Sequence, residues 1–140
     1  MTYTTLQSVK PVLERARVVA VLGASASPDK PAHYVPAYAA GKGYRVIPVN
    51  PGLEGQTLFG ESVHARLADI GEAVDIVDVF RRPELLPGHL EDILAMNPRP
   101  ALVWLQLGIR NDDFAAKLLE AGIEVVQDRC LLADHRALGL

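Results

Sequence analysis

Five consecutive apolar residues, Val18 to Leu22, end abruptly at Gly23. The run is too short for a helix and lacks the alternation of a half-exposed strand, so it predicts a parallel strand that is buried on both faces. Small and polar residues follow, and then Pro28 and Pro31, which suit a loop and the start of a helix. A strand, a tight turn and a helix start in this order bring backbone amides and the helix dipole to one point. Such a point is suited to holding a phosphate or another anion.

The same alternation continues along the chain. Further strands are predicted at 44–49, 74–80, 101–105 and 123–126, and helices at 4–15, 34–39, 85–96, 111–122 and 131–138, with a short helix or turn over 61–70. This pattern predicts an α/β fold of three layers, a Rossmann-like, doubly wound, parallel five-stranded sheet in the order 3-2-1-4-5. Ligands of such sheets bind at the carboxyl ends of the strands, where the winding reverses, here between the first and fourth strands. We therefore expect a site formed by the loops that begin at Gly23, Asn50, Phe80 and Gln106.

Composition argues against several classes of protein. A chain of 140 residues is expected to form one domain over 1–140. A net charge of −3 without a basic block argues against nucleic-acid binding. No run approaches the roughly 20 apolar residues that cross a bilayer, and residues 1–5 lack the start of a secretion signal, so we expect a cytoplasmic protein without a membrane partner. One cysteine, Cys130, and four scattered histidines predict no metal site.

The first loop fits a dinucleotide-binding fingerprint poorly. Gly23, Ser25 and Pro28 occupy the positions of the three glycines in G-x-G-x-x-G, and only the first position matches. NAD sites also carry an acidic residue at the end of the second strand, where this chain has Asn50. A neutral amide tolerates a phosphate on the ribose, which a carboxylate would repel.

Five segments, taken in order, resemble the small stand-alone CoA-binding proteins, which are similar to the nucleotide-binding domain of the succinyl-CoA synthetase alpha subunit. The segments are Gly23-Ala24-Ser25, Pro48-Val49-Asn50-Pro51, the stretch 74–81, Trp104-Leu105-Gln106-Leu107-Gly108 and Asp128-Arg129-Cys130. The resemblance covers nearly the whole chain, from about 16 to 134. It implies a domain that binds coenzyme A across the carboxyl ends of its strands.

The resemblance also implies which residues contact the ligand. Carried onto this chain, the contacts come from the loops after the first, second and fourth strands: Gly23, Ala24, Ser25 and Ser27, then Asn50 and Pro51, then Gln106, Leu107 and Gly108. Where the synthetase has a lysine beyond its second strand, this chain has Asn50-Pro51-Gly52, and Lys30, Arg81 or Arg82 is the candidate replacement. The synthetase's catalytic histidine belongs to a second domain with no counterpart in this sequence, so its catalysis is not transferred.

The residues themselves leave several interpretations open. Ser25 and Ser27 suit either phosphate contact or a structural role in the loop, and Arg81 with Arg82 suits either ligand phosphates or a solvated pair. Asp78, expected to form a structural hydrogen bond, and His33 are the weak candidates for acid–base work. We expect non-catalytic binding of CoA or a short acyl-CoA, with the pyrophosphate at the Gly23 loop. The alternatives are a small NAD(P)-dependent reductase and an accessory module for an acyl-CoA enzyme, and a homodimer is also open.

Overall fold

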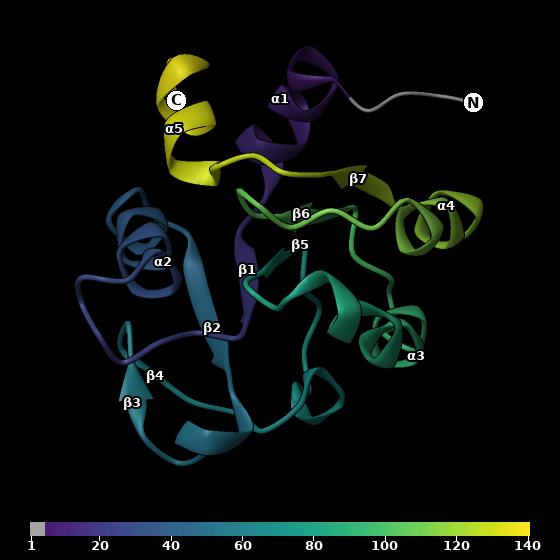
Figure 1. The fold of residues 1–140 in the computed structure, drawn as a ribbon. Helices are drawn as coiled ribbons and strands as arrows, with labels where there is room; N and C mark the ends of the chain where they lie inside the picture. The colour runs from purple at the N-terminus through teal and green to yellow at the C-terminus, as the bar shows by residue number, and fades with distance from the viewer. Residues whose placement is uncertain (1–4) are drawn as a thin grey trace.

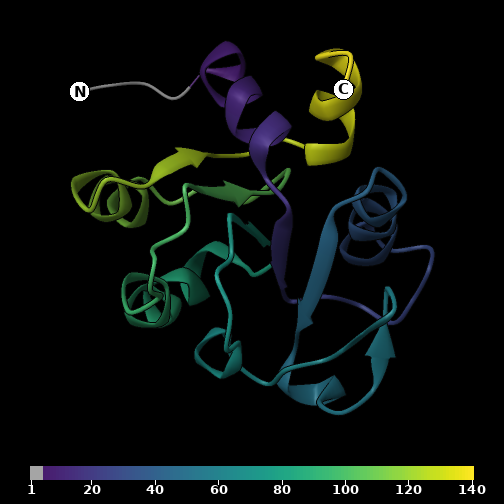
Figure 2. The same ribbon diagram turned by 180° about the vertical axis from the view of Figure 1, so that it is seen from behind.

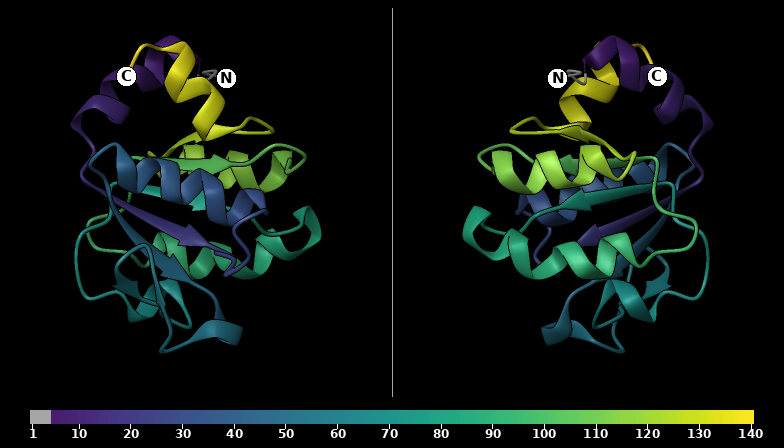
Figure 3. Two further views of the ribbon diagram at one scale, coloured as in Figure 1. Left: turned by 90° about the vertical axis from the view of Figure 1, so that its left-hand side faces the viewer. Right: turned by 90° about the vertical axis from the view of Figure 1, so that its right-hand side faces the viewer.

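The computed structural model describes residues 5–140 as a five-stranded parallel sheet between two layers of helices (Figure 1). Helices α1, α2 and α5 lie on one face of the sheet, and α3 and α4 lie on the other (Figure 3). The predicted fold class is therefore confirmed. The start of the first predicted helix at Thr4 and residues 1–4 of the predicted domain lie outside the described residues.

The elements agree closely with the predicted segments. The strands of the sheet are β1 Val18–Leu22, β2 Arg45–Val49, β5 Ile76–Val79, β6 Leu102–Leu105 and β7 Glu124–Val126, and β3 Thr57–Leu58 with β4 Glu61–Ser62 forms a small antiparallel pair. The helices are α1 Leu6–Arg15, α2 Pro31–Gly41, α3 Leu90–Leu94, α4 Asp112–Glu120 and α5 Leu131–Ala137, with short 3-10 turns η1 Pro51–Leu53, η2 Leu67–Asp69 and η3 Pro83–His89.

Successive residues of the strands belong to two separate hydrophobic cores. In β1, Val19 and Val21 pack toward α1, α2 and α5, whereas Ala20 and Leu22 pack toward α3 and α4. Because both faces are covered by helices, the strands are mostly apolar rather than alternating between apolar and polar residues. This arrangement confirms the interpretation of the segment before Gly23 as a strand buried on both faces.

The order of the strands differs from the prediction. Counting only the main sheet, the order is 2-1-3-4-5 rather than 3-2-1-4-5, because β5 pairs with β1 and not with β2. The outer side of β2 is taken instead by His64, which forms a single parallel bridge with Val49. His64 thus stands where the third strand was expected. The winding reverses between β1 and β5, so the ligand crevice of this topology lies between the loops that follow these two strands.

The segment around His64 also explains why Pro48 is tolerated in β2. The amide of His64 donates to the carbonyl of Pro48 at 3.0 Å, and the amide of Asn50 donates to the carbonyl of His64 at 2.9 Å. Pro48 therefore turns its backbone toward the outer side of β2, where its missing N–H removes no bond to β1. β2 therefore pairs with β1 in continuous register through Val49. Residues 61–70, expected as a short helix or turn, form β4, this bridge and η2 (Figure 2).

Helix α5 is fastened to its neighbours through the buried side chain of His135. Its Nδ1 lies 2.8 Å from the hydroxyl of Tyr38, and its Nε2 lies 3.3 Å from the hydroxyl of Tyr44. The hydroxyl of Tyr44 in turn donates to the carbonyl of Leu13 at 2.5 Å. Burial, and then the nearby charge of Lys42, lowers the pKa of His135. The lowered pKa favours the neutral imidazole. In that form the cluster links α1, α2 and α5.

Candidate functional site

A cleft of about 230 Å³ opens at the carboxyl ends of β1 and β2, against the start of α3. Its lining combines the ends of these strands with the segment 65–67 and with η3 and α3: Leu22, Gly23, Val49, Pro51, Ala65, Arg66, Leu67, Arg81, Gly88, His89, Glu91 and Asp92. The predicted residues Gly23, Pro51 and Arg81 thus come together in one place. The place is the topological switch point, where open parallel sheets bind their ligands.

Gly23 is required by the close approach of the loops after β1 and β5. Its φ of 91° lies in the region that favours glycine. A Cβ at this position would lie 2.8 Å from the carbonyl oxygen of Phe80 and 3.1 Å from Cδ of Arg81. The predicted residue Phe80 therefore supports the site through its backbone, which packs directly on Gly23.

Arg81 supplies a positive charge to the cleft. Its Nε is buried and, among the residues that the structure describes, has no hydrogen-bond partner. Burial, and then the charge of Arg81, lowers the pKa of the neighbouring His89. Arg82 points elsewhere, since its exposed guanidinium lies 3.5 Å from the exposed carboxylate of Glu84. The arginine pair therefore divides into one cleft residue and one surface residue.

Four amides of the first loop donate to acceptors within the protein. Gly23 and Ala24 both donate to the carbonyl of Val49, at 2.8 and 3.3 Å, and Ser25 donates to the carbonyl of Ala32 at 3.1 Å. The amide of Ser27 donates to Oγ of Ser25 at 3.0 Å. Each of these four amides therefore has an acceptor inside the fold.

The side chain of Asn50 joins two of the predicted loops. Its Nδ2 donates to the carbonyl of Ala24 at 2.8 Å, and its Oδ1 accepts from the amide of Gly52 at 2.9 Å. Both polar ends are thus satisfied by backbone groups. Asn50 holds the loop after β1 against the loop after β2, and Pro51 beside it lines the cleft.

The loop after β6 does not line this cleft. The buried side chain of Gln106 accepts a hydrogen bond from the amide of Leu131 at 3.1 Å, and the amide of Gly108 donates to Asp128 at 2.6 Å. Leu107 is 71% exposed. The separation follows from the strand order, because β5 lies between β1 and β6.

Lys30 and His33 belong to the beginning of α2 and also lie outside the cleft lining. Lys30 is exposed at the N-cap position. His33 places Nδ1 2.7 Å from the carbonyl of Ser25, and its ring lies 5.0 Å from that of Phe59. His33 therefore supports the first loop rather than the cleft.

Four titratable cleft residues were not predicted from the sequence: Arg66, His89, Glu91 and Asp92. Arg66 donates from Nη2 to Oδ1 of Asp92 at 2.7 Å and from Nε to Oδ2 at 3.3 Å. This bidentate ion pair connects the segment before η2 with α3 across the cleft. The two residues are far apart in the sequence and belong to no shared motif, so no sequence signal indicated the pair.

Asp78 lies within β5, away from the cleft lining. Both carboxylate oxygens are buried, and neither has a hydrogen-bond partner in the part of the chain that the structure describes. The predicted structural hydrogen bond is therefore absent. Burial raises the pKa of Asp78 well above its ordinary value, so the fold favours the neutral acid.

Among residues 5–140, no cluster of three or more His, Cys, Asp or Glu side chains is arranged to hold a metal ion. No helix within the same residues has the length and apolar character needed to cross a membrane.

Comparison with known proteins adds a family to this geometry. Residues 17–136 match the family described as a CoA binding domain. The uncharacterized protein YneT of Bacillus subtilis (strain 168) is 35% identical over 127 residues, which cover 91% of each chain. A protein from Thermus thermophilus, described as cell-free ID.343, is 52% identical with a TM-score of 0.92, over 96% of this chain and 99% of that one. A hypothetical protein from Pyrococcus horikoshii OT3 is 30% identical with a TM-score of 0.88, over 98% and 94%.

Proposed function

Because the chain belongs to the family of CoA binding domains, we propose that it binds coenzyme A or a short acyl-CoA, without catalysis, in the cleft beside Gly23. The observation that carries this proposal is the position of Arg81 at the switch point of the sheet, with its buried Nε free of partners within the described chain. A buried N–H without an acceptor is costly, and a phosphate oxygen that accepted from it would remove that cost. The ligand's diphosphate is thereby assigned to Arg81 rather than to the amides of the first loop.

The remaining cleft residues support the same assignment. Gly23 lets the loop after β5 pack closely enough to bring Arg81 to the cleft, and Pro51 and Leu22 provide apolar surface next to it. His89 lies close enough to Arg81 for the arginine charge to lower its pKa, so the imidazole can meet a phosphate oxygen as a neutral donor or accept a proton when the anion binds.

We assign no catalytic residue because neither of the two candidate acid–base groups lies in the cleft. Asp78 is buried within β5, and the imidazole of His33 lies within hydrogen-bond distance of the carbonyl of Ser25. Neither group lines the cleft. A bound thioester would therefore meet Arg66, His89, Glu91 and Asp92 but no nucleophile with an adjacent base. A carrier or sensor of CoA fits this set of side chains better than a transferase does.

Isothermal titration calorimetry with CoA, dephospho-CoA, NAD and NADP tests the proposal. Micromolar binding of CoA is expected, and Arg81→Ala should weaken it by about 10- to 100-fold, the value of one charge-assisted contact. Arg82→Ala is the matched control and should bind CoA as the wild type does, because Arg82 faces Glu84 at the surface. Heat with NADP but none with CoA would overturn the proposal. An absorbance assay for nicotinamide oxidation with small carbonyl substrates would reveal the reductase alternative.

A further inference from the structure

Two arginines from different segments line the cleft beside Gly23. Arg81 follows β5, and Arg66 belongs to the segment that follows the bridge of His64 with β2. The cleft, of about 230 Å³, is smaller than the roughly 300–1,000 Å³ of sites that enclose a whole drug-sized ligand. Only part of a CoA molecule therefore fits into it, and that part meets two guanidinium groups.

The guanidinium of Arg66 has one edge that is bound and one end that is open. Its Nε and Nη2 donate to the two carboxylate oxygens of Asp92, at 3.3 and 2.7 Å. Its Nη1 makes no hydrogen bond with any residue that the structure describes, and the side chain is 64% exposed. Asp92 thus fixes the direction of Arg66 and leaves its Nη1 end for a ligand. The planar fork of a guanidinium is suited to phosphate oxygens.

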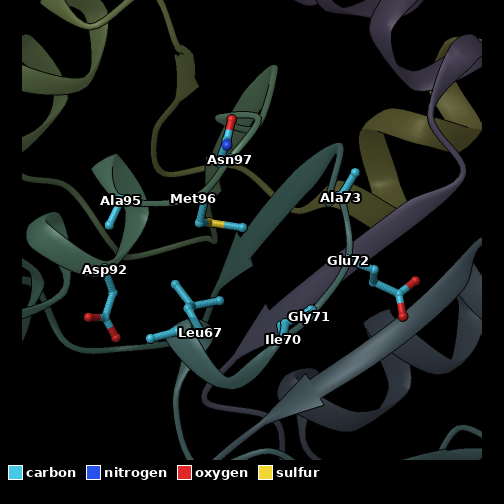
Figure 4. Close-up of a pocket in the computed structure, with 10 residues that line it drawn as sticks. Leu67, Ile70, Gly71, Glu72, Ala73, Asp92, Ala95, Met96 and Asn97 are labelled. Atoms are coloured by element: carbon cyan, nitrogen blue, oxygen red, sulfur yellow. The ribbon is translucent and has the colours of Figure 1, made fainter.

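A larger cavity, of about 420 Å³, lies beside Asp92 and the segment before β5, at the amino ends of the strands (Figure 4). Leu67 and Asp92 line both cavities and form the border between them. The only ionisable side chains in the lining of the larger cavity are the acidic Glu72 and Asp92. A phosphate is repelled there, so the anionic part of a ligand is confined to the cleft that holds Arg66 and Arg81.

The ribose is the part of CoA that carries two separate anionic groups close together. The diphosphate is attached to its 5′ carbon and a phosphate monoester to its 3′ carbon, whereas the adenine and the pantetheine arm carry no charge. The monoester has almost two negative charges at neutral pH. Because Glu91 and Asp92 also line the cleft, such a group is held only where a guanidinium faces it.

On the basis of the proposed function, we propose that Arg66 binds the 3′-phosphate of CoA while Arg81 binds the diphosphate, with the ribose in the cleft between them. Asp92 is then a positioning residue, which acts through Arg66. The protein distinguishes CoA from dephospho-CoA, because these compounds differ only in the 3′-phosphate. One charge-assisted contact from an exposed guanidinium makes CoA about tenfold tighter.

Calorimetry with CoA and dephospho-CoA tests this inference on three proteins: the wild type, Arg66→Gln and Arg110→Gln. Arg110 is the matched control, because it is 62% exposed and pairs with Asp112 at 3.1 Å outside the cleft lining. We expect the wild type and Arg110→Gln to prefer CoA about tenfold, and Arg66→Gln to prefer it less than about twofold. Both compounds are measured on the same protein, so partial unfolding of a variant changes both affinities alike and leaves their ratio intact.

The ratio of the two affinities separates this inference from the proposed function. If the wild type binds CoA no more tightly than dephospho-CoA, or if Arg66→Gln keeps the full preference, the inference is wrong and the proposed function stands. The same holds if Arg66→Gln weakens both compounds equally, since Arg66 then only supports the fold. If the wild type binds neither compound, the proposed function fails and the inference fails with it.

Discussion

Replacing Gly23 by alanine tests whether the loops after β1 and β5 are held as closely as the structure shows. Two costs add. An L-residue at a φ of 91° is strained by about 1–2 kcal/mol. The new Cβ would also stand 2.8 Å from the carbonyl oxygen of Phe80, so backbone must move, at a cost of about 1–3 kcal/mol. We therefore expect Gly23→Ala to lower the free energy of unfolding by about 2–5 kcal/mol.

Two other glycines serve as matched controls. Gly122 has a φ of 84° but nothing within 4 Å of a Cβ, so Gly122→Ala should lose only the strain, about 1–2 kcal/mol. Gly41 ends α2 without a positive φ and with open space around it, so Gly41→Ala should be neutral or slightly stabilising. Urea denaturation followed by circular dichroism, with the slope m unchanged, gives the three differences.

The contact with Phe80 also predicts an effect on binding. Because Cδ of Arg81 lies 3.1 Å from the same Cβ position, Gly23→Ala should displace Arg81 and weaken CoA binding, whereas Gly122→Ala should not. If Gly23→Ala is no less stable than Gly122→Ala and binds CoA equally well, the close approach of these loops is not real and the argument for the cleft is refuted.

Three further substitutions probe the interior. Asp78→Asn should stabilise the protein at neutral pH, because burial raises the pKa of Asp78 and the wild type therefore loses stability as the pH rises above the ordinary carboxyl value of 3.8; equal urea midpoints for the two proteins at pH 8 would contradict this. The pKa of His135 is lowered, so the wild type should lose stability as the pH falls below 6.5, and His135→Gln should show a shallower melting-temperature slope between pH 7.5 and 5.5. Asn50→Ala removes one hydrogen bond between loops and one within its own loop, and should cost about 1–3 kcal/mol in chemical denaturation, a loss that an intact midpoint would disprove.

The sequence predicted the elements well because every strand of the sheet is largely apolar, with at most one charged residue. It predicted the strand order incorrectly because His64, the residue that replaces a strand beside β2, pairs through a single bridge and carries no strand pattern of its own. Pairing between segments that are distant in the sequence leaves no signal in local periodicity.

Only part of the candidate site was predicted, because the direction of each side chain depends on contacts between segments that are distant in the sequence. Arg81 and Arg82 are neighbours of the same type, and only the direction of the chain after β5 places one in the cleft and the other beside Glu84. The polar residues Asn50 and Gln106 stand at the expected strand ends, yet their side chains satisfy backbone groups of other loops. Residue type and position indicated the edge of the sheet that carries the site, but not which side chains remain free for a ligand.

The bridge at His64 also bears on how the protein behaves when it is concentrated. In the carboxyl half of β2, the backbone of Pro48 is directed toward the outer side of the sheet and has no N–H. The carbonyl of Pro48 and the amide of Asn50 are already hydrogen-bonded to His64. A second chain that approached this side would find no row of unsatisfied backbone groups to extend the sheet. This side of the molecule should therefore resist strand-by-strand growth into ordered aggregates, although the strand along it is apolar and only one residue shields it.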